Sequence, residues 1–141
     1  MNSVDVSLSG IQEPTWLETY RTACREVLDR LGAEDWEVSI LLCDNQTIRE
    51  LNRRFRDEDS ATDVLSFPQE EMGPGFDRYH GVVGDVAISL EYAGRWKHLM
   101  RLTVHGLLHL AGYDHGTPED KADMDRRQES VVGDISEDFS L

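Results

Sequence analysis

Two kinds of apolar spacing alternate along the chain, and this alternation limits the possible folds more than any other feature of the sequence. Apolar residues occupy every second position at Val4, Val6 and Leu8, as in a half-buried strand, whereas they recur at intervals of three and four between Thr15 and Gly32, as in an amphipathic helix. Strands are further expected at 36–43, 64–67 and 82–88, and helices at 46–56, 89–98, 99–111 and from 117 onwards. This order predicts an α/β (α+β) fold with a single mixed β-sheet of about four strands covered by about five helices.

The length of 141 residues suits one domain, so residues 1–141 are expected to fold as a single unit. No stretch has the roughly 20 consecutive apolar residues that a bilayer crossing requires, and the first residues, MNSVDVSLSG, do not resemble a secretory signal. Cys24 and Cys43 lie within apolar segments, which favours buried thiols in a reducing compartment. We therefore expect a cytoplasmic protein that has no membrane partner.

Two segments lack the regular spacing of apolar residues that is typical of packed strands and helices. The stretch 69–79, which contains the sequence GPG, is typical of an exposed loop. The acidic tail beyond Gly133 is expected to fray.

The formal net charge of −14 argues against a protein that coats nucleic acid through bulk electrostatics. It leaves room for a local basic patch, because only two of the 14 basic residues, Lys97 and Lys121, are not arginine, the residue best suited to bidentate phosphate contacts. In the helix expected at 46–56, the spacing places Arg49, Arg53 and Arg56 on one face, which is either a phosphate-binding stripe or a solvated surface. The face expected to meet the core carries Ile48, Leu51, Asn52 and Phe55.

The stretch HGLLHLAGYDH at 105–115 contains three of the five histidines of the chain. Residues four apart on a helix project to the same side, so His105 and His109 can present ring nitrogens to one point, and a turn at Gly112 can return His115 toward them. Three imidazoles suit zinc and leave a fourth position open for water or substrate, as in catalytic rather than structural sites. We predict one Zn²⁺ per chain at these three histidines.

The histidine spacing also overlaps the zinc-protease pattern H-E-x-x-H-x-x-G-x-x-H, in which a glutamate after the first histidine acts as general base. Gly106 occupies that position here, so a zinc metalloprotease or another zinc hydrolase is a minor alternative. A further alternative is a non-enzymatic ribosome-binding factor with structural zinc, which would need a fourth ligand from an aspartate or glutamate. Asp114 either orients a ligand histidine or forms a turn.

At these residues the sequence resembles the YbeY family of bacterial metal-dependent endoribonucleases. The resemblance rests on four ordered blocks, LNRRFR at 51–56, TDVLSFP at 62–68, GDVAIS at 84–89 and HGLLHLAGYDH at 105–115, and on Met124 and the pair Gln128-Glu129. It runs from the second expected strand to the last helix. It implies a YbeY-like metallohydrolase domain in which the metal site lies at the end of a groove.

The resemblance also implies a function, namely single-strand-specific endoribonuclease activity in ribosomal RNA maturation, at the 3′ end of 16S rRNA, and in ribosome quality control. The expected partners are single-stranded RNA, rRNA and the ribosome or its small subunit, and no DNA is expected. By the same resemblance His105, His109 and His115 are zinc ligands, and Arg56 and His105 have catalytic roles. Arg49, Arg53 and Arg56 are then expected to contact the substrate.

Two departures from the family pattern are visible. Ala61 stands where the family usually has proline or lysine, and the segment between Ile88 and His105 is shorter than in the family, which predicts a truncated helix after GDVAIS. In the expected mechanism, zinc acidifies a water molecule or polarises a phosphoryl oxygen, while Arg56 neutralises charge that develops on the phosphate. Asp85 and Asp114 are the candidate general bases, and the attacking group is left open.

Overall fold

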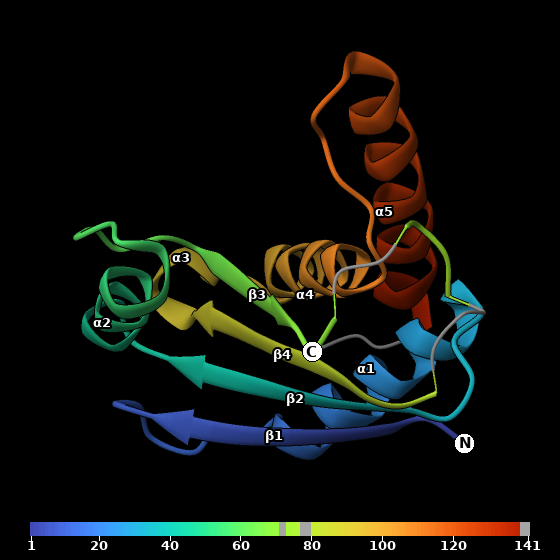
Figure 1. The fold of residues 1–141 in the computed structure, drawn as a ribbon. Helices are drawn as coiled ribbons and strands as arrows, with labels where there is room; N and C mark the ends of the chain where they lie inside the picture. Colours follow the sequence, from blue (N-terminus) through green and yellow to red (C-terminus); the bar gives the residue numbers. More distant parts are fainter. Residues whose placement is uncertain (71–72, 77–79, 139–141) are drawn as a thin grey trace.

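The computed structural model describes residues 1–70, 73–76 and 80–138, in which strands and helices follow the predicted order (Figure 1). The elements are β1 (Ser3–Ser9), α1 (Leu17–Leu31), β2 (Trp36–Cys43), α2 (Asn45–Arg56), β3 (Val64–Pro68), β4 (Gly81–Ser89), α3 (Leu90–Ala93), α4 (Trp96–Leu110) and α5 (Pro118–Asp138). The predicted α+β fold is confirmed. The helix expected at 89–98 is interrupted at Gly94, because α3 ends at Ala93 and α4 already begins at Trp96. None of the helices in the described part of the chain combines the length and the apolar character needed to cross a bilayer.

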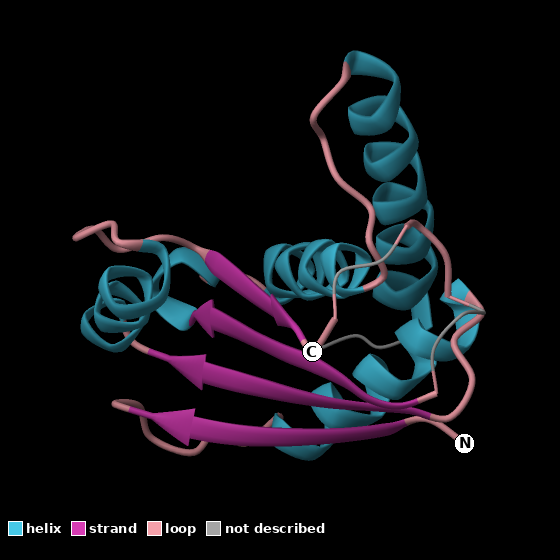
Figure 2. Cartoon of the chain, viewed as in Figure 1, coloured by secondary structure: helices cyan, strands magenta, loops and turns pink. Residues whose placement is uncertain are grey.

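The four strands form one mixed sheet in the order β1-β2-β4-β3 (Figure 2). Strands β1, β2 and β4 are parallel, and β3 pairs antiparallel with β4, with Ser66 opposite Val86. The register of β4 shifts at a bulge, where Val83 is inserted between the partners of Glu37 and Val38. Because β3 is an edge strand, one side of its backbone remains open to side chains and ligands.

Helix α2 begins directly after β2 because Asp44 caps it. The Asp44 Oδ1 atom accepts a hydrogen bond of 2.8 Å from the backbone N–H of Thr47, which satisfies one of the free donors of the first turn. The helix ends at Asp57, whose φ of 57° lies in the left-handed region. Arg53, Arg54 and Arg56 therefore occupy the last turn, where the helix dipole favours positive charge.

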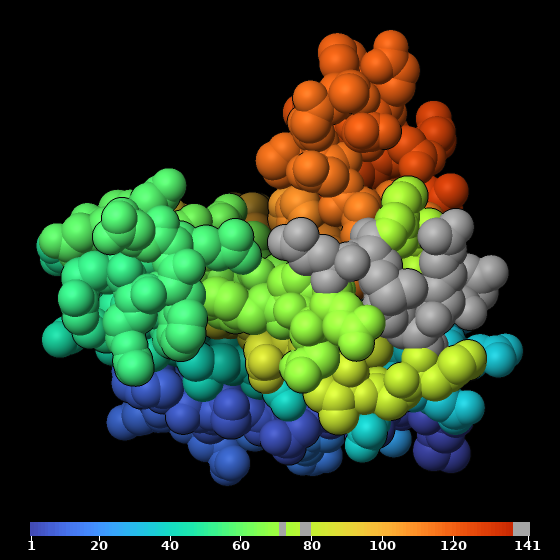
Figure 3. All heavy atoms as spheres, viewed as in Figure 1, coloured from blue at the N-terminus to red at the C-terminus, as the bar shows by residue number. Residues whose placement is uncertain are grey.

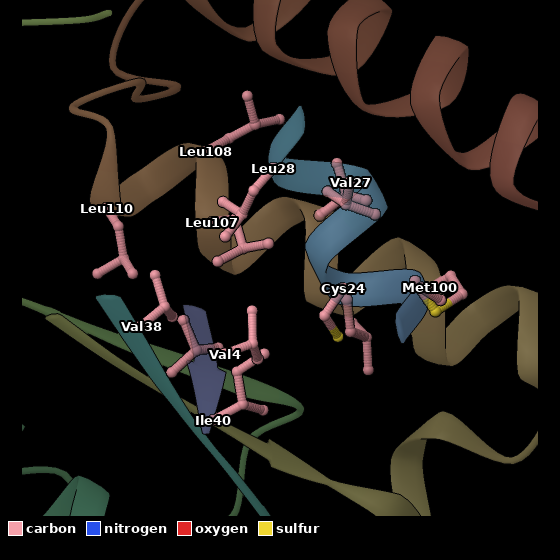
Figure 4. Close-up of a cluster of buried hydrophobic side chains, with 14 of the residues drawn as sticks. Val4, Cys24, Val27, Leu28, Val38, Ile40, Met100, Leu107, Leu108 and Leu110 are labelled. Carbon is pink, nitrogen blue, oxygen red and sulfur yellow. The ribbon is translucent and has the colours of Figure 1, made fainter. Parts of the chain in front are cut away.

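The main core lies between one face of the sheet and helices α1, α4 and α5. Val38 and Ile40 project from β2 toward the α4 side chain Leu107, as the close-up shows (Figure 4). A buried hydrogen bond of 2.7 Å between the hydroxyls of Tyr20 and Thr103 joins α1 to α4 within this core. The core thus fixes α4, which carries two of the predicted metal ligands, against the sheet.

Both cysteines are buried, as predicted. Burial raises the pKa of the Cys24 thiol to about 12 and that of Cys43 to about 11, so both thiols stay protonated at neutral pH. Cys43 packs with Ile48 and Ala87 in a smaller cluster, where α2 covers one end of the opposite face of the sheet.

The expected core face of α2 is wrong at one of its four positions. Ile48 and Asn52 are buried and Leu51 is half-buried, but the side chain of Phe55 is 60% exposed. Phe55 meets Phe67 of the edge strand at a ring-centroid distance of 5.5 Å. Since β3 is the last strand, the sheet offers no further surface beneath this turn of the helix.

The expected fraying beyond Gly133 is also wrong for the described residues. Helix α5 continues to Asp138, and Ile135 is fully buried in the main core. Burial of this side chain, together with an ion pair of 3.5 Å between Asp134 and Arg30 of α1, outweighs the weak helix propensity of glycine. Residues 139–141 of the expected tail lie outside the described part of the chain.

The stretch 69–79 is only partly described, since 71–72 and 77–79 lie outside the described residues. Within it, the expectation of exposure is wrong for Phe76, which is buried and stacks on Trp36 at a ring-centroid distance of 5.1 Å. The backbone N–H of Gly75 donates a 3.0 Å hydrogen bond to the carbonyl of Ala111. Gly75 is therefore attached to the end of α4.

Gly106 sets how closely α4 approaches the sheet, and its replacement tests that contact. A Cβ atom at this position would lie 2.6 Å from Val86 Cγ1 and 3.3 Å from Ser66 Oγ. We expect Gly106→Ala to lower the free energy of unfolding by about 1–3 kcal/mol in urea titrations, because the core has no room for the added methyl group.

The matched control for this substitution is Gly133→Ala, a helical position with no heavy atom within 4 Å of the added Cβ. It is expected to raise the free energy of unfolding by up to about 1 kcal/mol through helix propensity alone. A Gly106→Ala variant as stable as the wild type would show that α4 does not depend on this close approach.

Candidate metal centre and its groove

His105 and His109 lie one turn apart on α4 and face the same point, as their spacing predicted. Their Nε2 atoms are 3.1 Å apart, and their ring planes are close to perpendicular, at 80°. Two Zn–N bonds of about 2.1 Å at the tetrahedral angle would hold the two nitrogens roughly 3.4 Å apart. The separation is therefore close to that of two ligands of one ion.

The chain leaves α4 and returns the third histidine to the same point. Gly112 has a φ of 90°, which reverses the chain direction after the helix. The ring of His115 then lies 5.3 Å from that of His109 and 6.1 Å from that of His105, between ring centroids. One ligand atom from each of the three histidines can be chosen so that all lie within 4.8 Å of one another. Among the described residues the group contains these three members and no fourth.

The hydrogen bonds of the two helical histidines fix which ring nitrogen is free. The Nδ1–H of His109 donates to the carbonyl of Tyr113 at 3.0 Å, and the Nδ1–H of His105 donates to Oε1 of Gln128 at 2.9 Å. Both Nε2 atoms consequently carry lone pairs, and two lone pairs 3.1 Å apart repel unless a cation lies between them. The donor set therefore fits a divalent metal ion.

The surroundings of His109 favour its neutral form. Burial is the largest cause that lowers the pKa of His109 below its usual range, followed by Coulombic repulsion from His105 and then from His115. A histidine must be deprotonated at its ligating nitrogen to bind a metal, so a lowered pKa keeps His109 available at neutral pH.

Gln128 of α5 contacts the centre, and no sequence spacing predicts this contact. Its amide N–H donates to Oε2 of Glu129 at 3.2 Å, which directs the amide oxygen toward His105. Glu129 is held in turn by Arg101 of α4, through a two-pronged ion pair with contacts from 2.8 to 3.2 Å. The sequence signal for this residue was the pair Gln128-Glu129, one of the features on which the family resemblance rests.

The three histidines open into a groove of about 670 Å³ that runs along β3. In the space-filling view, α2 with its following loop and the segment after α4 lie on either side of the β3 region (Figure 3). The groove is lined by Asn52, Arg56 and Glu58, by residues 62–66, by Pro68 and Glu70, and by His105, His109, Leu110, 112–114 and His115.

The three arginines predicted to contact the substrate differ in their position relative to the groove. Arg56 lines the groove with the histidines, and its Nη2 donates a 2.5 Å hydrogen bond to the carbonyl of Ser66. Arg49 and Arg53 are outside the lining and form ion pairs with Asp59 and Glu50, respectively. The structure thus brings one arginine of the predicted stripe together with the histidines.

Ser66 links the two sides of the groove. Its carbonyl accepts from Arg56, and its hydroxyl donates a 3.0 Å hydrogen bond to the carbonyl of Gly106 on α4. A single residue of the edge strand therefore contacts both the arginine and the helix that bears His105.

Of the two candidate general bases, Asp114 lies in the groove lining and Asp85 lies outside it. Asp114 lines the groove, and its Oδ1 accepts a 2.7 Å hydrogen bond from the backbone N–H of His115. The same oxygen lies 4.0 Å from Nδ1 of His115. Asp85 is exposed on β4 and is not part of the groove lining.

Fold and site together define the class: an α+β protein with a mixed sheet, in which a three-histidine centre lies at one end of a groove. The sequence matches the family model described as "Endoribonuclease YbeY" over residues 4–136. The chain belongs to the endoribonuclease YbeY family.

Individual relatives agree with the family assignment. The chain is 40% identical over 130 residues to "Endoribonuclease YbeY" of Persephonella marina, covering 85% of this chain and 84% of the relative. It is 42% identical over 134 residues to the protein of the same name from Bacillus cereus, covering 82% and 86%. Among solved structures, TM1509 from Thermotoga maritima has a similar fold, with a TM-score of 0.63 at 27% identity over 95% of this chain and 91% of that one.

The Gln128 contact can be tested without any assay of activity. Gln128→Leu keeps the side-chain volume but removes the acceptor of the His105 Nδ1–H, so the ring is free to rotate. We expect Co²⁺ or Zn²⁺ affinity, measured by competition with a chromophoric chelator, to fall about 10- to 100-fold.

Ser130→Ala, at the exposed position two residues further along α5, is the matched control and should bind metal as the wild type does. Equal affinities of Gln128→Leu and the wild type would mean that the amide does not orient His105.

Proposed function

We propose that this protein is a zinc-dependent endoribonuclease that cleaves single-stranded RNA in ribosomal RNA maturation. The observation that carries the proposal is the pair of facing Nε2 atoms on α4, in a groove that also contains Arg56. Membership of the endoribonuclease YbeY family supports the activity on RNA. His105, His109 and His115 would hold the metal.

Zinc is the proposed ion because all three donors are imidazole nitrogens, which suit this borderline-soft metal better than Mg²⁺ or Ca²⁺. When bound, zinc supplies Lewis acidity and acidifies a water molecule. The histidines keep their Nε2 lone pairs directed at one point because Tyr113 and Gln128 occupy the Nδ1–H groups.

Arg56 is proposed to hold the phosphate of the cleaved bond. Its guanidinium has no carboxylate partner among the described residues, and its hydrogen bond to the Ser66 carbonyl uses only part of its donor set. The remaining donors can contact the phosphate oxygens as negative charge increases in the transition state. The planar, permanently charged group suits this role better than lysine would.

Arg49 and Arg53 remain predicted substrate contacts outside the groove lining. Each would have to exchange its carboxylate partner for a phosphate, which is feasible because exposed ion pairs contribute little stability. Their contribution to binding is therefore expected to be smaller than that of Arg56.

The negative net charge of the protein limits which RNA it can bind. A net charge of −14 disfavours weak binding to arbitrary RNA, since most of the surface repels phosphate. This favours RNA presented by the ribosome or its small subunit, in the cytoplasm, where additional contacts can offset the repulsion.

The alternatives from the sequence receive less support. Gly106 occupies the position of the protease base, and even a methyl group there would collide with Val86. A structural zinc would need a fourth ligand, whereas the described residues supply three.

Metal content is the first test of the proposal. Untagged protein purified without added metal or chelator should contain one zinc per chain by elemental mass spectrometry, and His109→Ala should lose it. A wild-type protein that holds no zinc after zinc is offered would refute the metal centre.

Cleavage of a labelled single-stranded RNA tests the role of Arg56. Arg56→Ala should reduce kcat by about 100- to 1000-fold with zinc content unchanged, as for loss of a transition-state hydrogen-bond donor. RNA duplex and DNA of the same sequence should resist cleavage by the wild type.

Arg25→Ala is the matched control for Arg56→Ala, because Arg25 is exposed on α1, which contributes nothing to the groove. Undiminished cleavage by Arg56→Ala would remove this arginine from the catalytic groups.

A further inference from the structure

An aromatic side chain stands exposed beside the groove. Phe55 precedes Arg56 at the end of α2, and 60% of its surface is open to solvent. Burial of a phenylalanine ring stabilises a folded protein, so an exposed ring forgoes much of that stabilisation. The other large apolar side chains that are exposed in the described part of the chain, Met1, Val82 and Tyr92, are on other elements.

A second aromatic ring packs against the exposed one. Phe67 of β3 meets it edge to face, with ring centroids 5.5 Å apart and planes at 65°. Phe67 itself is half-buried in the cluster between α2 and the sheet. Phe55 is thus supported at one edge by a fixed ring, while much of its surface stays accessible.

Two guanidinium groups flank this pair of rings. Arg54 lies 5.6 Å from the centroid of Phe55, and Arg56 lies 5.6 Å from the centroid of Phe67. Neither arginine forms an ion pair with a carboxylate in the described part of the chain. Arg49 and Arg53, earlier on the same helix, are both paired. In the described part of α2, the arginines without a carboxylate partner are therefore the two that lie against the Phe55–Phe67 pair.

The pair of rings adjoins the groove through Arg56, whereas Phe55 and Phe67 themselves are outside the groove lining. Arg56, the next residue along the chain, lines the groove together with the three histidines and is tied to the Ser66 carbonyl of the edge strand. A strand of nucleic acid with a phosphate at Arg56 would therefore have its neighbouring nucleotide near the ring of Phe55.

We infer that Phe55 is a stacking subsite for a nucleobase of single-stranded RNA, adjacent to the nucleotide that is cleaved, with Arg54 and Arg56 on the phosphates that flank this base. Aromatic rings bind single strands by stacking, and arginines beside them bind the backbone. A base in a duplex is already stacked and paired, so this subsite selects unpaired RNA. The inference rests on the proposed function, because it assigns the subsite to the same substrate.

A protein partner is the rival occupant of an exposed ring, since aromatic residues are common in the centres of interfaces. Such centres are well packed and shielded from water, whereas Phe55 is exposed, with Arg54 against its own ring and Arg56 against the ring of Phe67. The charge around the ring favours a polyanion.

The test measures binding separately from cleavage. A short fluorescent 2′-O-methyl oligoribonucleotide, which keeps the bases and the phosphates of RNA, is titrated with the zinc-loaded protein in an anisotropy assay. Phe55→Ala is expected to weaken binding by about 5- to 100-fold, and Phe55→Trp is expected to retain it. The control Tyr92→Ala, at an exposed aromatic residue on α3, should bind as the wild type does.

An abasic scan identifies the ring's partner. Removal of one base at the stacking position should weaken binding to the wild type and leave binding to Phe55→Ala unchanged, while abasic sites elsewhere affect both proteins equally. Equal affinity of Phe55→Ala and the wild type, or the absence of any abasic position that removes their difference, would overturn the inference. The inference would also be overturned if Phe55→Ala lost binding to small ribosomal subunits but bound the oligonucleotide as tightly as the wild type. That result would assign the ring to a protein contact.

Cleavage of the unmodified RNA reports on the proposed function alone. Oligonucleotide binding that depends on Phe55, without cleavage by the wild type, would leave the stacking subsite established and refute the nuclease. Cleavage by the wild type that Phe55→Ala leaves unchanged in both KM and kcat would confirm the nuclease and overturn the subsite.

Discussion

The close approach of α4 to the sheet at Gly106 is the contact on which the rest of the site depends. Without a side chain at this position, the helix lies against Val86 of β4 and Ser66 of β3. That contact sets the depth of His105 relative to the edge strand. The same edge strand holds Arg56 through the Ser66 carbonyl, so the arginine and the histidine share one reference point. A small change in this packing would alter their separation.

The hydrogen bonds around the histidines convert a cluster into a directed set of ligands. Spacing along α4 brings two rings together, but it does not decide which nitrogen of each ring faces the other. The Tyr113 carbonyl and the Gln128 amide decide it, because each accepts the Nδ1–H of one histidine. The turn after α4 and the crossing of α5 are therefore parts of the centre as much as the histidines are.

The sequence could predict what depends on neighbours along the chain. The order of strands and helices and the convergence of His105 and His109 follow from local spacing. The contact of Gln128 with His105 joins residues 23 positions apart, and no spacing encodes it. Phe55 was misplaced because periodicity identifies the face of a helix but not where the sheet beneath it ends. Ile135 was missed because its burial depends on how α5 crosses the core.

The network from Arg101 through Glu129 and Gln128 to His105 spans two helices. Opening of α5 away from α4 would break it and release the His105 ring, so the competence of the centre is coupled to a local unfolding equilibrium. By thermodynamic linkage, any ligand that requires the oriented ring must also disfavour that opening, by RT ln(1 + [L]/Kd). Slower amide hydrogen exchange along α5 would be the signature of an occupied site, at positions that never contact the ligand.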